Sequence, residues 1–311
     1  MKPTILLDSK LPYKNVVDLA YRHIKSKSVN SNNPAVVNLH GLFGSGRMFG
    51  AIAKRLANDL NTDVYNVDIR NHGNSPIAKP YDYLTLTNDV IHLLRNQIGH
   101  ERPISIIGFS MGGKIGLLSS LSRRLNVVKC ISIDMPPYET LKLGKDITEN
   151  YDTIVKLCRR EIKVQKGHKG WKDQIIKTFQ NLPVNKRPGA ALYFSEGFLE
   201  VKDNMKPFDS SADADPYVNY KVPLLEMPDL LDNIKTGLNV NDLDPLAFKK
   251  KAAARVLFMR GLSSPLISDN YDMLCTHFPN CRVQEFDTGH AIMIESPTEF
   301  YQSCVKHLAN D

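Results

Sequence analysis

The stretch IIGFSMGGK, residues 106–114, decides how this chain is interpreted. A β-branched run ends at Gly108, Ser110 lies between Gly108 and Gly112, and a helix-forming segment begins at Met111. Glycines two positions before and after a serine leave room for a tight strand-to-helix turn, which lifts the serine hydroxyl clear of a sheet. The pattern G-x-S-x-G in this setting indicates that Ser110 is a nucleophile. The alternative is a tight turn with no chemical role.

Strand-like and helix-like segments alternate around this motif. Four segments have the apolar, β-branched character of buried strands, and two have apolar side chains at helical spacing. The strands are residues 35–40, 63–68, 104–108 and 127–134, and the helices are residues 48–60 and 84–98. Such alternation predicts an α/β fold, with a mostly parallel sheet that carries helices on both faces.

The alternation stops after the fourth strand and resumes near the end of the chain. Residues 254–261 predict another strand and residues 297–309 a closing helix, whereas the segment between is polar, helical in propensity and interrupted by prolines. We therefore predict one α/β core made of residues 1–139 and 251–311. Residues 140–250 are expected to form a helical cap, or lid, inserted over the site.

A second glycine-rich loop, NLHGLFGSG at residues 38–46, precedes the serine motif. A His-Gly pair at the end of a strand, followed by small residues, suits a loop whose backbone N–H groups bind an oxyanion. We expect the N–H groups of Leu42 and Met111 to form the oxyanion hole. The alternative is a glycine-rich turn between a strand and a helix.

An activated serine needs a general base within hydrogen-bonding reach. Of the nine histidines, His290 lies in FDTGHAIMIESP, just after the last predicted strand. A serine on such an elbow is followed in the chain by its acid and then by its histidine, which favours His290 as the base. His40 is the rival base, although its position suits a loop-structuring role better.

The acid of the triad has two candidates. Proteins of this design usually carry an aspartate a few residues after the strand that precedes the histidine, but Ser264 occupies that place here. Asp269 lies farther along and fits the N-terminus of a helix. Asp134 ends the strand that follows the nucleophile, so it can reach the imidazole from the neighbouring strand. We predict that Asp134 orients His290, with Asp269 as the alternative.

The loop DIRNHGNS, residues 68–75, has the polar composition of a structural loop close to the site. Asp68 and Arg70 are expected to brace it as a pair, and His72 is expected to help fix its conformation. None of these side chains is expected to react.

Composition limits the remaining classes of function. The formal charge is +7 and the isoelectric point about 9.0, but Lys and Arg are scattered, and no aromatic-basic module suggests nucleic-acid binding. The five cysteines are irregularly spaced and include no C-x-x-C pair, so neither a disulfide framework nor a metal site is expected, and a reducing compartment fits best. No run is long enough to predict a transmembrane helix.

Four of these motifs together resemble one family. HGLFGS, DIRNHGNS, GFSMGGK and SIDMPPY are similar to the corresponding segments of the alpha/beta-hydrolase superfamily. More narrowly, they resemble the mitochondrial abhydrolase and fungal ethanol acetyltransferase-like branch, in which several members place the triad acid where Asp134 stands. Phe109 departs from the histidine that more often precedes the nucleophile.

The resemblance implies acyl transfer through a serine ester. Members of that branch transfer acetyl groups from acetyl-CoA to alcohols and hydrolyse esters or thioesters when water replaces the alcohol. We therefore expect acetyl-CoA as a co-substrate, no tightly bound cofactor, and a mitochondrial location, with a cytoplasmic location as the alternative. Lys163, Lys166 and Lys169 in the expected cap are candidates for the CoA phosphates, or form a solvated helix face. A plain carboxylesterase or thioesterase, or a non-catalytic binding protein on the same fold, are the alternatives.

Overall fold

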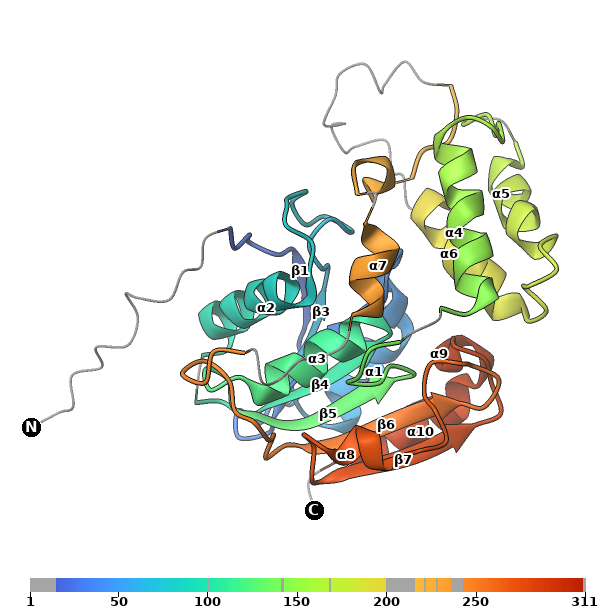
Figure 1. Cartoon of the computed structure of the whole chain (residues 1–311). Helices are drawn as coiled ribbons and strands as arrows, with labels where there is room; N and C mark the ends of the chain where they lie inside the picture. Colours follow the sequence, from blue (N-terminus) through green and yellow to red (C-terminus); the bar gives the residue numbers. More distant parts are fainter. Residues whose placement is uncertain are drawn as a thin grey trace, which may run out of the picture.

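The computed structural model describes residues 15–99, 101–140, 143–167, 169–199, 216–220, 222–227, 229–236 and 243–309. Within these ranges the chain forms a seven-stranded sheet with helices packed against it and a group of helices at one end (Figure 1). The α/β fold predicted from the sequence is confirmed.

The sheet has the strand order β1-β3-β2-β4-β5-β6-β7. Only β1 is antiparallel to its neighbour, and every other pairing is parallel. The strands are β1 Tyr21–Ile24, β2 Ala35–Leu39, β3 Val64–Val67, β4 Ile104–Phe109, β5 Val127–Ile133, β6 Arg255–Gly261 and β7 Cys281–Phe286. Because the central strands are parallel, their carboxyl ends meet at one edge, where open α/β sheets bind their ligands.

Helices cover the sheet in two pairs. Helices α2 and α3 pack against each other, with α3 on β4 and β5, whereas α1 and α10 pack together elsewhere on the sheet (Figure 1). These helices are α1 Gly50–Asp59, α2 Tyr83–Gln97, α3 Met111–Leu121 and α10 Pro297–Leu308. Strands β2, β3 and β4 are buried along their whole length, as expected for parallel strands covered on both faces.

The remaining helices lie mostly between β5 and β6 in the chain. They are α4 Lys145–Cys158, α5 Trp171–Gln180, α6 Pro188–Leu199 and α7 Leu230–Lys235, with a 3-10 turn at Leu224–Glu226. Helices α4, α5 and α6 gather beside the carboxyl edge of the sheet (Figure 1). Two four-residue helices, α8 Asp272–Cys275 and α9 Ile292–Glu295, flank β7.

One cysteine pair departs from the expectation that the chain has no disulfide. Cys275 and Cys281 are bonded, with their Cα atoms 5.7 Å apart. The two residues end α8 and begin β7, so the turn between those elements brings their side chains together. Their irregular spacing gave no sign of this proximity.

Candidate active site

Ser110 occupies the junction between β4 and α3. Its backbone has φ 51° and ψ −119°, a strained conformation that is rare for a residue with a side chain. The Ser110 N–H donates to the Ile133 carbonyl oxygen at 3.0 Å, which ties this turn to the end of β5. Ser110 is buried, with 8% of the residue exposed.

Two glycines make this turn sterically allowed. A Cβ atom on Gly108 would lie 2.2 Å from the Gly112 carbonyl oxygen, and one on Gly112 would lie 2.2 Å from the Leu39 carbonyl oxygen. Both distances are far inside van der Waals contact. The G-x-S-x-G spacing therefore follows from close packing of α3 on β4 and β2.

Asp134 and His290 are joined by a hydrogen bond. The Nδ1 atom of His290 lies 2.7 Å from Oδ2 of Asp134, and since a carboxylate only accepts, Nδ1 carries the proton. The Asp134 side chain is fully buried, and its Oδ1 accepts from the Gly261 N–H at 3.1 Å. The bond holds the imidazole in the tautomer that leaves Nε2 with its lone pair.

His290 also lies against the residue that precedes Ser110. The rings of His290 and Phe109 have centroids 4.8 Å apart, with 36° between their planes. Among the residues that the structure describes, no hydrogen bond joins the Ser110 hydroxyl to His290. Catalytic hydrogen bonds are often long in unliganded enzymes and shorten when substrate binds.

The alternative acid lies elsewhere. Asp269 is exposed and forms an ion pair with Arg260, on β6. Ser264, where the acid of related folds usually lies, is a buried loop residue whose N–H donates to the Gly261 carbonyl oxygen. Among the described residues, neither side chain forms a hydrogen bond or an ion pair with His290.

The loop Gly41–Phe43 follows β2 and runs beside the serine turn. Within the described ranges, neither the Leu42 N–H nor the Met111 N–H donates to a protein acceptor. The Met111 N–H belongs to the first turn of α3, where helical N–H groups are unpaired and the helix dipole is positive. Both groups are therefore free to bind an external acceptor.

His40 and His72 hydrogen-bond to the backbone of this loop and its surroundings. They have the loop-structuring role that the sequence predicted. Nδ1 of His40 donates to the Gly41 carbonyl oxygen at 2.8 Å, and its Nε2 accepts from the Ile69 N–H at 2.9 Å. Burial lowers the pKa of His40 to about 4, which keeps it neutral. Because both ring nitrogens are occupied, His40 has no lone pair left for a serine.

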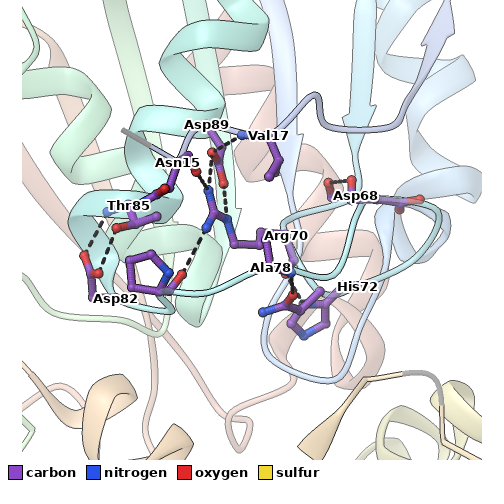
Figure 2. A network of polar contacts seen from close by, with 12 residues as sticks. Asn15, Val17, Asp68, Arg70, His72, Ala78, Asp82, Thr85 and Asp89 are labelled. Carbon is purple, nitrogen blue, oxygen red and sulfur yellow. Dashed lines mark hydrogen bonds and ion pairs between the residues drawn. The ribbon is translucent and has the colours of Figure 1, made fainter. Parts of the chain in front are cut away.

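Asp68 and Arg70 brace their loop with different partners from those expected. Asp68 accepts from the N–H groups of Gly46 and Asn74, at 2.7 and 2.8 Å. Arg70 is fully buried and makes a two-point ion pair with Asp89 of α2, with distances of 2.7 and 2.8 Å (Figure 2). The predicted Asp68–Arg70 pair is therefore wrong, because a helix outside the motif supplies the carboxylate.

A cavity of about 200 Å³ opens beside His290. Its walls combine aromatic side chains from both sides, Phe109 from the sheet edge and Tyr193 and Phe194 from α6. Lys186 and Arg187 also line it, and Arg187 forms an ion pair with Glu295 at 3.0 Å. Glu295 in turn accepts from the N–H of Gly289, the residue before His290, at 2.9 Å.

Sequence reasoning missed the residues of α6 that reach this site. Tyr193 and Phe194 of α6, and Arg187 just before it, carry no local mark of function in the sequence. The lysines proposed for CoA phosphates, Lys163, Lys166 and Lys169, are exposed and do not line the cavity.

In the part of the chain that the structure covers, no helix is long and apolar enough to span a bilayer. In those same ranges, no cluster of His, Cys, Asp or Glu is arranged to hold a metal ion.

Known proteins resemble this chain over nearly its whole length. Ethanol acetyltransferase 1 of Eremothecium cymbalariae is 28% identical, with 95% of this chain and 82% of that protein aligned. A probable alcohol acetyltransferase of Wickerhamomyces anomalus is 26% identical, with 94% of this chain and 86% of that protein aligned.

Solved structures share the fold. A marine microorganism esterase superposes with a TM-score of 0.73 at 22% identity, covering 94% of this chain and 99% of that one. A thermophilic esterase from Thermogutta terrifontis gives a TM-score of 0.58 at 16% identity, covering 93% and 92%. Residues 34–297 match the family model described as the alpha/beta hydrolase fold. This chain therefore belongs to the alpha/beta hydrolase fold family.

Proposed function

We propose that this protein is a serine-dependent acyltransferase that moves an acetyl group from acetyl-CoA to a small alcohol. Ester and thioester hydrolysis is its side reaction. The observation that carries the proposal is His290, whose ring is fixed by the buried Asp134 carboxylate and packs on the residue before Ser110. The relatives named ethanol and alcohol acetyltransferases support the choice of donor and acceptor.

The first half of the reaction forms an acyl-enzyme. Nε2 of His290 takes the proton of the Ser110 hydroxyl as the oxygen attacks the thioester carbonyl carbon. Asp134 stabilises the imidazolium that results. When the tetrahedral intermediate collapses, the carbon–sulfur bond breaks and the thiolate takes the proton from His290.

The second half repeats these steps with an alcohol. Its hydroxyl attacks the ester carbonyl of acylated Ser110 while His290 accepts its proton, and collapse returns that proton to the Ser110 oxygen. The product is an acetate ester. Water in place of the alcohol gives free acetate.

The N–H groups of Leu42 and Met111 bind the oxyanion of each tetrahedral intermediate. Neither N–H donates to an acceptor among the residues that the structure describes, which supports this role. Removing one donor from such a hole costs about 3 to 4 kcal/mol of transition-state stabilisation. The positive end of the α3 dipole adds to the same effect.

The cavity supports a small substrate. Its volume of about 200 Å³ is below the range of pockets that bind drug-sized ligands, so it suits the small alcohol and not the whole of acetyl-CoA. We assign residues 140–250 as a cap that roofs this cavity through α6, and we place the protein in the mitochondrion on the family resemblance. Expression of the tagged full chain in yeast, followed by microscopy, tests the location.

Product analysis tests the function. The purified full chain is incubated with acetyl-CoA, with and without ethanol, and ethyl acetate is measured by gas chromatography. The expected result is ethyl acetate with the wild type and none with Ser110→Ala. Free acetate alone would identify a plain esterase or thioesterase. Failure of a fluorophosphonate to label Ser110 in the folded protein would point to a non-catalytic binding protein.

A further inference from the structure

The Tyr193 hydroxyl of α6 contacts the loop that carries the Leu42 N–H. It donates a hydrogen bond to the Leu42 carbonyl oxygen, since a carbonyl can only accept. Tyr193 is buried, and burial raises the pKa of its phenol above the ordinary value, so the donor proton is retained at neutral pH. A side chain from the inserted helices therefore bonds directly to the backbone of the Gly41–Phe43 loop.

The peptide unit between Leu42 and Phe43 is held at both ends. Tyr193 binds its carbonyl oxygen, and its N–H, on Phe43, donates to Nε2 of His72 at 3.2 Å. Phe43 has a φ of 72°, which is unfavourable for a residue with a side chain, so this turn depends on outside contacts. Tyr220, also from the inserted segment, donates to the Phe43 carbonyl oxygen at 3.1 Å.

Tyr193 also packs on the other side of the site. Its ring meets Phe109 edge to face, with centroids 5.4 Å apart, and Phe109 in turn packs on His290. Gly41 leaves the space for this contact, because a Cβ there would lie 2.8 Å from both the Tyr193 oxygen and the Phe109 ring. One side chain thus links α6, the Gly41–Phe43 loop and the residue before the nucleophile.

We propose that Tyr193 is a positioning residue that sets the oxyanion hole by fixing the Leu42–Phe43 peptide unit. This inference rests on the proposed function. The Leu42 N–H belongs to the Gly41–Leu42 peptide unit, whose carbonyl oxygen accepts from His40, whereas Tyr193 holds the next peptide unit. With both units held, rotation at the Leu42 Cα atom between them is restricted, and so is the direction of the N–H. The consequence is that the hole has its working geometry only while α6 is seated on the sheet edge.

The test removes the Tyr193 hydroxyl and keeps the ring. Tyr193→Phe preserves the contact with Phe109, and Tyr83→Phe is the matched control, because its buried hydroxyl donates to the Ile234 carbonyl oxygen of α7 instead. Three quantities are measured on the full chain with p-nitrophenyl acetate: kcat, KM and the inhibition constant of a small trifluoromethyl ketone. Such a ketone forms a tetrahedral oxyanion with the serine and therefore reports on the hole.

Tyr193→Phe should lower kcat by about tenfold or more, since loss of a whole donor costs 10²- to 10³-fold. The ketone should bind more weakly by a similar factor while KM changes little, because the hole acts on the transition state. Tyr83→Phe should keep wild-type values of all three. A purely structural role would lower the melting temperature and leave kcat of the folded protein unchanged.

Unchanged kcat and ketone affinity in folded Tyr193→Phe, with Ser110→Ala inactive, would overturn this inference alone. Wild-type turnover by Ser110→Ala would instead overturn the proposed function. If Tyr193→Phe does not fold, His72→Phe tests the same Leu42–Phe43 peptide unit, because Nε2 of His72 accepts from the Phe43 N–H. A wild-type kcat and ketone affinity in that variant would reject the proposal.

Discussion

The His290 ring and the Asp134 carboxylate meet through a 2.7 Å hydrogen bond although 156 residues separate them in the chain. Asp134 directly follows β5 and adopts a φ of 47°, a left-handed turn that aims its side chain across the end of β6. The Asp134 N–H donates to the Met259 carbonyl oxygen, and its Oδ1 accepts from the Gly261 N–H. The end of β6 therefore fixes the carboxylate that holds the imidazole.

Asp134→Asn should lower kcat by about 10³- to 10⁴-fold, because an amide can donate to Nδ1 and favours the wrong tautomer of His290. Turnover of p-nitrophenyl acetate measures the effect. Asp269→Asn is the control and should stay near the wild type, since Asp269 is exposed and pairs with Arg260. The assignment would be reversed if Asp269→Asn were the inactive variant.

Gly108→Ala should destabilise the protein by about 1 to 3 kcal/mol or more, as overpacking in a core does. The added methyl group would lie 2.2 Å from the Gly112 carbonyl oxygen, so β4 and α3 must move apart. Urea denaturation measures the change. Gly50→Ala is the control: its methyl group would meet nothing within 4 Å at the start of α1, and alanine favours helix there. Equal stability of the two variants would contradict the close-packed elbow.

Asp89→Ala should cost about 3 to 5 kcal/mol, because it leaves the buried Arg70 guanidinium without its counter-charge. The same carboxylate accepts from the Val17 N–H at 3.0 Å, so the segment before β1 should loosen as well (Figure 2). Chemical denaturation and hydrogen exchange at Val17 measure the two effects. Asp82→Ala, which removes the cap of α2, should cost only about 1 kcal/mol. Equal losses of stability in Asp89→Ala and Asp82→Ala would show that the Arg70–Asp89 ion pair contributes no more than a helix cap.

Contacts at the sheet edge could be predicted because parallel strands bring their carboxyl ends together. The order of strands and motifs was enough to place Ser110 after β4 and Asp134 after β5, and to expect His290 near the carboxylate. Their catalytic roles stay predictions. The role of the elbow glycines could also be predicted, because their spacing reflects steric exclusion within one short turn.

Other contacts could not be predicted, because they depend on how separate elements pack against one another. Arg70 pairs with Asp89 because α2 packs beside the loop that carries Arg70. Asp68 is nearer to Arg70 in the sequence, but its carboxylate accepts hydrogen bonds from backbone N–H groups instead. Cys275 meets Cys281 through the turn between α8 and β7. Tyr193 reaches the Gly41–Phe43 loop from a helix about 150 residues away, so only the docking of α6 reveals it.

Lys114 should make the stability of the protein depend on pH. Its side chain is buried in α3, donates to the carbonyl oxygens of Thr236 and Tyr138, and has its pKa lowered by burial from 10.5 to about 7. Between these two values the unfolded chain holds a proton that the folded chain has released, so raising the pH favours folding. The free energy of unfolding should therefore rise from about pH 7 toward about pH 10, by at most about 1.4 kcal/mol per pH unit.

Urea denaturation of the wild type and of Lys114→Met across this range isolates the effect, because the other titrating groups are common to both chains. The difference in stability, wild type minus variant, should increase with pH, and a difference that stays constant would mean that Lys114 keeps its charge in the folded protein.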